Sequence, residues 1–101
     1  MYRINWKPLS KLTFSDEIDF TIQKWNLEIA DEFVVLVYDY LATLSKTPTI
    51  GIYKAENNCY SLVISKQTTL YYKIIEEKSQ IDLVLFWNNS QNPNLLSKLL
   101  K

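Results

Sequence analysis

Few side chains in this sequence could do chemistry, and what is missing excludes most enzyme classes. The 101 residues include no histidine and a single cysteine, Cys59. A Cys/His metal site and the histidine-based triads therefore cannot be built from them. One glycine, Gly51, is too few for a glycine-rich phosphate loop. We expect no metal and no cofactor, and we expect Cys59 to be a small core residue, since no histidine can serve as its base.

The remaining chemical candidates are lysines interleaved with a tyrosine in a strand pattern. Alternation along residues 68–75 divides the strand into two faces. If one set packs on helices (Leu70, Tyr72 and Ile74), the other faces outward (Thr69, Tyr71 and Lys73). Lys66 at the preceding turn and Lys54 on an earlier strand could join the outward set. Such a surface can hold a phosphate backbone and stack a base, but it is equally an ordinary solvated sheet face.

Acidic residues are concentrated in one part of the chain. Residues 16–39 hold seven carboxylates against Lys24 alone, a balance of −6, and the remainder carries +6. This asymmetry indicates either a charged partner or two solvated faces of opposite sign. Asp16, Glu17 and Asp19 form a carboxylate cluster, which we interpret as the solvated outer face of an amphipathic helix.

Two helices are expected to follow a short first strand. Residues 2–6 alternate, placing Tyr2, Ile4 and Trp6 toward the core. A first helix begins near Pro8, or at Asp16 with Ser15 as its cap. Its apolar positions are Phe14, Ile18, Ile22 and Trp25. Asn26 caps a second helix, and the two should form an antiparallel hairpin. The apolar stripe of the second helix is Leu27, Ala30, Phe33, Val34, Val37, Leu41 and Leu44. Four residues lie off this stripe and must face the sheet or a partner: Val35, Leu36, Tyr38 and Tyr40.

The second half of the chain reads as strands. Pro48 ends the helix, residues 52–55 form a short strand, and adjacent asparagines at 57–58 allow a tight turn. Three runs at 59–65, 68–75 and 80–87 then predict an antiparallel meander, with the apolar run 83–87 as an inner strand. After Pro93, Asn94 caps a last short helix over 95–100. The expected fold is one α+β domain over residues 1–101, a helical hairpin packed on an antiparallel sheet. No stretch resembles a membrane span or a signal peptide, so we expect a cytoplasmic protein.

The order of these elements, with particular residues in it, resembles the RelE/ParE family of toxins from bacterial type II toxin–antitoxin systems. The resemblance rests on Trp6, Trp25, Ala30, Phe33, Leu41, Leu44, Pro48 and Gly51 at familiar spacing. It also rests on two longer segments, residues 65–74 and 85–93. It covers nearly the whole chain and implies growth inhibition, plasmid stabilisation and an oligomer with a cognate antitoxin whose C-terminal segment wraps the toxin.

The family has two branches of activity, and the resemblance implies one of them. RelE-like members cleave mRNA on the ribosome with arginines and lysines, often with a tyrosine or histidine near the C-terminus. ParE-like members lack that set and poison DNA gyrase. Where RelE-like enzymes place arginine or histidine, this chain has Thr68, Thr69, Trp87, Asn88 and Ser90. Its only arginine, Arg3, lies at the other end of the sequence.

We therefore expect a ParE-like toxin that acts by protein–protein contact. The alternatives are a ribosome-dependent, metal-independent mRNA endonuclease and a degenerate member that only binds antitoxin. In the nuclease case, the catalytic candidates are Lys66, Tyr71 and Lys73. The residues expected to contact a target are Lys54, Lys66, Tyr71, Lys73 and Trp87. Antitoxin contacts are expected from Val35, Leu36, Tyr38 and Tyr40.

Overall fold

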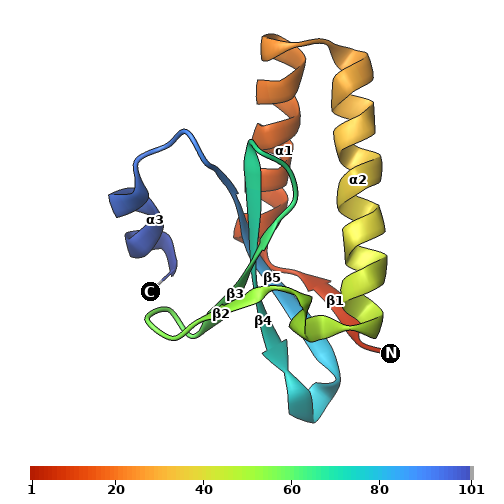
Figure 1. Ribbon diagram of the computed structural model, residues 1–101, viewed down its shortest axis with the longest axis vertical. Coiled ribbons are helices and arrows are strands. Elements are labelled where there is room, and N and C mark those ends of the chain that lie inside the picture. The colour runs from red at the N-terminus through yellow and green to blue at the C-terminus, as the bar shows by residue number, and fades with distance from the viewer. Residues whose placement is uncertain (101) are drawn as a thin grey trace.

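The computed structural model describes residues 1–100 and confirms the predicted order of elements. Its strands are β1 (Arg3–Trp6), β2 (Ile52–Lys54), β3 (Cys59–Val63), β4 (Thr68–Ile75) and β5 (Gln80–Asn88). Its helices are α1 (Pro8–Lys24), α2 (Leu27–Lys46) and α3 (Pro93–Leu100), with 3-10 turns at Pro48–Ile50 and Glu76–Lys78. Figure 1 shows α1 and α2 side by side as an antiparallel hairpin, with α3 on the other side of the sheet.

The sheet has five strands in the order β1-β5-β4-β3-β2. The pairs from β2 to β5 are antiparallel, which confirms the predicted meander. The first strand pairs in parallel with β5, Ile4 opposite Ile81, so the sheet is mixed at this one edge. A parallel pair needs a long connection between its strands. Here that connection comprises every element from α1 to β4. Because β5 pairs with β1 on one side and with β4 on the other, it is an inner strand.

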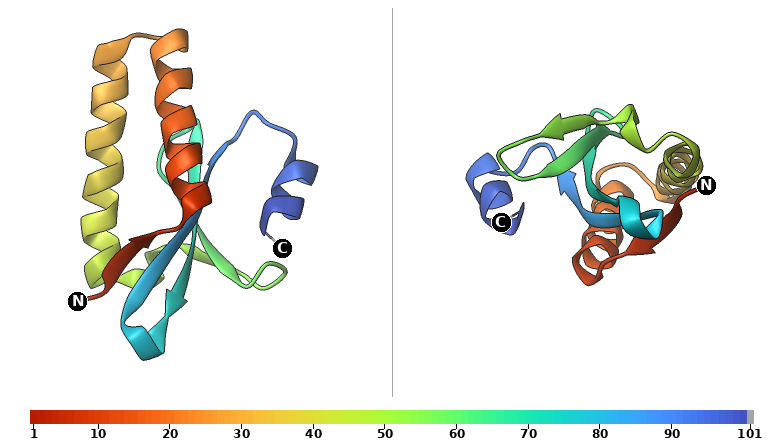
Figure 2. Two further views of the ribbon diagram at one scale, coloured as in Figure 1. Left: turned by 180° about the vertical axis from the view of Figure 1, so that it is seen from behind. Right: turned by 90° about the horizontal axis from the view of Figure 1, so that it is seen from below.

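The main core lies between the helical hairpin and one face of the sheet. The α2 residues Phe33, Val37, Leu41 and Leu44 pack against buried residues of β4 and β5, including Tyr72 and Phe86. The predicted core positions of β1 pack against the same cluster. Leu27 is an exception to the predicted stripe, because it is 63% exposed at the start of α2. Figures 1 and 2 show the reason: the hairpin extends beyond the sheet at the α1–α2 turn.

The first helix differs most from its prediction. It begins at Pro8 and runs through Ser15, so the alternative start at Asp16 is wrong. Its predicted apolar positions Ile22 and Trp25 are exposed, because they lie at the end of the hairpin beyond the sheet. Glu17, predicted to face solvent, is only 4% exposed and points toward the sheet. Asp16 and Asp19 are exposed, so the three carboxylates do not form one cluster.

The predicted helix caps and turns are largely confirmed. The Asn26 side chain accepts a hydrogen bond from the Ile29 backbone N–H at 2.9 Å. Asn58 adopts a positive φ of 51°, as a tight turn requires. The last helix begins at Pro93 rather than at residue 95, because proline is well suited to the first helical turn. There the Asn92 side chain, not that of Asn94, accepts a backbone bond.

A second, smaller core lies on the opposite face of the sheet. Cys59, Leu85, Trp87 and Leu100 form it, and Tyr71 packs against it. Cys59 is 1% exposed, which confirms its prediction as a core residue. Within residues 1–100, no helix has the length and apolar character needed to cross a membrane.

Candidate partner-binding site

The sheet face opposite the hairpin brings together three of the predicted site residues. Lys54 pairs with Cys59 across β2 and β3, and Lys73 lies on β4 near the same thiol. Burial raises the pKa of Cys59, and the nearby ammonium groups of Lys73 and Lys54 oppose this increase without cancelling it. Tyr71, two residues from Lys73, is half-buried, and burial raises the pKa of its hydroxyl. This face therefore carries two lysines beside a tyrosine that stays protonated at neutral pH.

The other two predicted target contacts do not belong to this group. Lys66 lies before the start of β4, about 20 Å from Lys73 at the usual rise per strand residue. Trp87 is 6% exposed and packs with Cys59, Leu85 and Leu100 under α3. In this structure little of the Trp87 ring is therefore open to a partner, and its role as a target contact stays a prediction.

Of the positions expected from the resemblance to carry catalytic groups, Thr68, Thr69, Trp87 and Asn88 are buried, whereas Ser90 is exposed. Thr68, Thr69 and Asn88 are at most 7% exposed. The Thr69 hydroxyl donates to Asn89 Oδ1 at 2.9 Å. Ser90 donates through both its backbone N–H and its hydroxyl to Asn88 Oδ1. These internal hydrogen bonds engage the side chains of Thr69, Asn88 and Ser90 within the fold.

Glu17 is the centre of this hydrogen-bonding network. Its Oε1 accepts from the Thr68 hydroxyl at 2.5 Å, and its Oε2 accepts from Asn88 Nδ2 at 3.1 Å. Burying a carboxylate is favourable only when donors replace its water. The spacing of polar residues in the sequence could have indicated that the Glu17 side chain points toward the sheet. Ser10, Glu17 and Thr21 recur at spacings of seven and four, so they share a helix face, and all three are buried.

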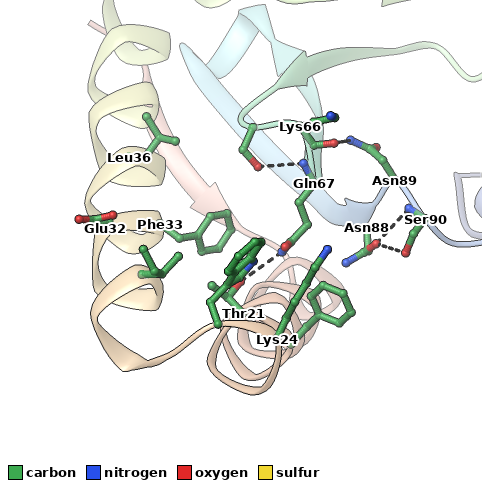
Figure 3. A pocket seen from close by; sticks show the side chains of 14 residues that line it. Thr21, Lys24, Glu32, Phe33, Leu36, Lys66, Gln67, Asn88, Asn89 and Ser90 are labelled. Atoms are coloured by element: carbon green, nitrogen blue, oxygen red, sulfur yellow. Dashed lines mark hydrogen bonds between the residues drawn. The ribbon is translucent and has the colours of Figure 1, made fainter.

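Directly beside this network lies a pocket of about 700 Å³. It is bounded by the end of α1, the start of α2, the turn between β3 and β4, and residues 88–90 (Figure 3). We call it the hairpin pocket. Its apolar wall consists of Phe20, Trp25, Ile29, Phe33 and Leu36. Its polar lining consists of Thr21, Lys24, Glu32, Ser65, Lys66, Gln67, Asn88, Asn89 and Ser90.

Aromatic rings and cations meet in the hairpin pocket. The Lys24 ammonium lies 5.7 Å from the centroid of the Phe20 ring and 5.6 Å from that of Trp25. Figure 3 shows Lys24 extending toward Gln67 and Asn88, whereas the Glu32 carboxylate points away on the far side of α2. Trp25 is 60% exposed, an unusual position for so large an apolar ring.

The polar part of the pocket is already held in place by internal hydrogen bonds. Gln67 Nε2 donates to the Thr21 hydroxyl at 3.1 Å, which joins the turn to α1. Asn89 Nδ2 donates to the Lys66 carbonyl oxygen at 3.1 Å. Ser65 Oγ accepts from the backbone N–H groups of Gln67 and Thr68. The pocket is therefore preformed, and a ligand would not have to order it.

The four predicted antitoxin contacts do not share one surface. Leu36 lines the hairpin pocket. Tyr38 lies in a second pocket of about 290 Å³, with Trp6, Lys11 and Phe14. Val35 is 61% exposed, and Tyr40 packs against the main core. Within residues 1–100, no group of three or more His, Cys, Asp or Glu residues is placed to hold a metal ion.

Comparison with known proteins finds similarity in structure but not in sequence. No protein-family model matches the chain. A search of curated proteins also finds no match. Among solved structures, the chain is similar to one from the crystal structure of the intact E. coli RelBE toxin–antitoxin complex. The two chains share 15% identity with a TM-score of 0.59, over 87% of this chain and 96% of the other. At that identity, the similarity shows a shared fold, which is the RelE-like fold that the sequence resemblance implies.

Proposed function

We propose that this protein is the toxin of a type II toxin–antitoxin pair, that it acts by protein–protein contact as ParE-like toxins do, and that a cognate antitoxin neutralises it. The fold supports the class of protein, since a chain of the same architecture occurs in a toxin–antitoxin complex. The observation that carries the non-nucleolytic branch is the burial of Thr68, Thr69 and Asn88. These positions hold structural hydrogen bonds where a ribosome-dependent nuclease of this fold would present catalytic cations.

The chemistry of RNA cleavage supports the same conclusion. Without a metal, cleavage needs a base for the 2′-hydroxyl, an acid for the leaving group and cations for the developing charge. Lys54 and Lys73 could supply charge and Tyr71 a proton, but the pKa of Tyr71 is raised by burial. No group on this face is suited to act as the base. The proposed setting is the bacterial cytoplasm, with DNA gyrase as the first target to test and plasmid stabilisation as the biological role.

One experiment separates the branches. The chain is induced alone and together with the protein encoded by its neighbouring gene, and growth is followed. Arrest relieved by co-expression supports the toxin proposal, whereas a harmless chain that binds no neighbour-encoded protein overturns it. In arrested cells, intact ribosome-bound mRNA in primer extension and altered plasmid supercoiling support the ParE-like branch.

A second candidate function is the ribosome-dependent mRNA endonuclease. It is favoured by the placement of Lys54 and Lys73 on both sides of Cys59, with Tyr71 on the same face. Cut message that disappears in Lys73→Ala and Tyr71→Phe variants would establish this function. A third result, antitoxin binding without growth arrest, would identify a degenerate member that only binds antitoxin.

A further inference from the structure

We propose that α3 is a detachable cover over the surface through which the toxin contacts its target, and that the target segment which replaces α3 presents two apolar side chains and a neighbouring carboxylate. This inference rests on the proposed function and names the surface and the state of the protein that perform it. The hidden surface, which we call the covered face, lies on the side of the sheet opposite the hairpin. Its residues are Lys54, Cys59, Tyr71, Lys73, Leu85 and Trp87.

The attachment of α3 to the rest of the chain is slight. Within residues 1–100, the hydrogen bonds that leave the helix reach no further than Asn92, which accepts from the backbone N–H groups of Asn94 and Leu95. Leu96 and Leu100 are the α3 residues that belong to the second core. A helix of eight residues is not stable by itself in water, so the order of α3 depends on these few contacts.

The connection before α3 is suited to act as a hinge. The chain is held up to residue 91, since the Asn89 N–H donates to the Gln67 carbonyl at 2.7 Å and the Gln91 N–H to the Asn88 carbonyl at 3.0 Å. The exposed Asn92 then leads directly into α3. Figures 1 and 2 show α3 at the edge of the molecule, joined to β5 by this single connection. Rotation at Asn92 would move α3 without disturbing the main core, to which no α3 residue belongs.

The helix α3 carries leucines on two sides. Leu96 and Leu100, four residues apart, pack in the second core. Leu95 and Leu99, also four residues apart, are 47% and 38% exposed. A surface helix is typically apolar on one side only, and apolar residues on more than one side indicate a helix that is buried more fully. The docked position therefore leaves half of the leucines of α3 without cover, so it does not use all the apolar surface that could hold the helix.

What α3 hides includes two of the residues that the sequence predicts as target contacts. Trp87 is 6% exposed, and Tyr71 is half-buried against the same cluster, to which Leu100 also belongs. Tryptophan and tyrosine are enriched among the side chains that dominate the binding energy of protein interfaces. Release of Leu100 would open the Trp87 ring to a partner, which reconciles its predicted role with its burial.

Charge and shape together define the occupant of the covered face. The ammonium groups of Lys73 and Lys54 lie close enough to the Cys59 thiol to act on its pKa, and the Glu56 carboxylate acts there in the opposite direction. Two ammonium groups against one carboxylate leave an excess positive charge beside the cluster, which attracts a carboxylate on the partner. The shape that fits is shown by α3 itself, a helix with two apolar side chains four residues apart.

The first measurement is the rate at which Ellman's reagent labels Cys59, the only cysteine, in native buffer. When α3 closes faster than the reagent reacts, this rate follows the fraction of open molecules. Leu100→Asp should increase it by about tenfold or more, and the milder Leu96→Ala by about fivefold. The matched control is Leu99→Asp, the same change on the outward side of α3, expected within about threefold of wild type. Circular dichroism and denaturant unfolding confirm that the main core of each variant is folded. Equal labelling of Leu100→Asp and Leu99→Asp would overturn the inference.

The second measurement is growth arrest as a function of the amount of toxin in the cell, determined by immunoblot. If the target binds only the open state, its apparent affinity is proportional to the open fraction. Leu96→Ala should therefore arrest growth at a level about fivefold below that of wild type, in proportion to its faster labelling. Unchanged or weaker arrest by a variant that labels faster would overturn the inference and leave the proposed function standing. A wild-type chain that causes no arrest would overturn the proposed function itself.

A charge reversal tests the chemistry of the occupant. In the Leu96→Ala background, Lys73→Glu should raise the level needed for arrest by about tenfold or more, because the carboxylate of the target would meet a like charge. The control is Lys46→Glu at the end of α2, which makes the same change in net charge and should alter this level by less than about threefold. Equal effects of the two reversals would overturn the acidic occupant. Cut ribosome-bound mRNA in the arrested cells would do the same, because it would identify a nucleic acid in place of a protein.

Discussion

The Glu17 carboxylate of α1 accepts a hydrogen bond of 2.5 Å from the Thr68 hydroxyl of β4, 51 residues further along the chain. The same carboxylate accepts from Asn88 at the end of β5. One side chain thereby joins the helical hairpin to β4, the central strand, and to its neighbour β5. It also holds one edge of the hairpin pocket, since Asn88 is part of the pocket lining.

Removing the Glu17 carboxylate should destabilise the fold. In Glu17→Ala, Thr68 and Asn88 lose their acceptor while they remain buried, so we expect the free energy of unfolding to fall by about 2–4 kcal/mol. Denaturant unfolding measures this change. The control is Asp16→Asn on the exposed side of the same helix turn, expected within about 0.5 kcal/mol of wild type. A Glu17→Ala variant as stable as Asp16→Asn would contradict the structural role of the network.

The buried Tyr72 hydroxyl should stabilise the segment between α2 and β2. It donates to the Pro48 carbonyl at 2.7 Å and accepts from the Gly51 N–H at 3.1 Å. Tyr72→Phe leaves both backbone groups without this partner, so we expect a loss of about 1–3 kcal/mol in thermal or denaturant unfolding. Tyr53→Phe, whose exposed hydroxyl binds only Asn58, is the control and should be nearly neutral. Equal effects of the two substitutions would reject this account.

Gly51 should not tolerate a side chain. A Cβ at this position would lie 2.7 Å from the Tyr72 hydroxyl oxygen and 2.8 Å from the Ser61 carbonyl oxygen. The Ser61 carbonyl belongs to the backbone of β3 and cannot swing aside as a flexible side chain would, so the chain around residue 51 has to shift. Gly51→Ala should therefore reduce the free energy of unfolding by about 1–3 kcal/mol, which lowers the melting temperature by several degrees. Unchanged melting of Gly51→Ala would show that the turn moves freely.

The Cys59 thiol should react slowly with thiol reagents in the native protein. It is 1% exposed, and burial keeps its pKa raised, so little reactive thiolate is present at neutral pH. We expect Ellman's reagent to label it far faster in concentrated guanidinium than in buffer. Fast native labelling would mean that α3 readily leaves the second core, since Leu100 of α3 packs in the same cluster.

Asp82 should contribute to the acid sensitivity of the fold. Burial acts to raise its pKa, but hydrogen bonds from Asn5 and Gln80, with the charges of Lys7 and Lys78, outweigh it and lower the pKa below the ordinary value of 3.8. The ionised group therefore stabilises the fold above the pKa of the unfolded chain, and this stabilisation is lost as the pH falls through the folded-state pKa.

The measurement for Asp82 is the free energy of unfolding of wild type and Asp82→Asn from neutral pH down to about pH 3. Wild type should be the more stable protein at neutral pH, and the difference should shrink as the solution becomes acidic. Asp19→Asn, on the exposed face of α1, should show no such convergence. A constant difference between wild type and Asp82→Asn would contradict the lowered pKa.

Local patterns in the sequence determined the elements and the main core of this protein. The apolar stripe of α2 from Ala30 to Leu44, the cap at Asn26 and the alternation in β4 are repeats or caps within a few residues. Hydrophobic burial is non-directional, so such periodicity reports directly which face turns inward. Cys59 was likewise predictable as a core residue, because the sequence offers no second cysteine for a disulfide and no histidine to act as a base for its thiol.

Only the tertiary structure decided whether polar and partly apolar side chains are buried or exposed when their contact partners are distant in the sequence. Glu17 is buried because Thr68 and Asn88 provide donors. Its spacing from Ser10 and Thr21 indicates a shared helix face, but the donors lie 51 and 71 residues further along the chain. Trp87 is covered by Leu100, and Lys66 is separated from Lys73 by the length of a strand. Trp25 follows the helical spacing but extends past the sheet that would cover it. Burial of a charge depends on donors brought by distant segments, so the hairpin pocket and its network emerge only when α1, α2, β4 and β5 are assembled.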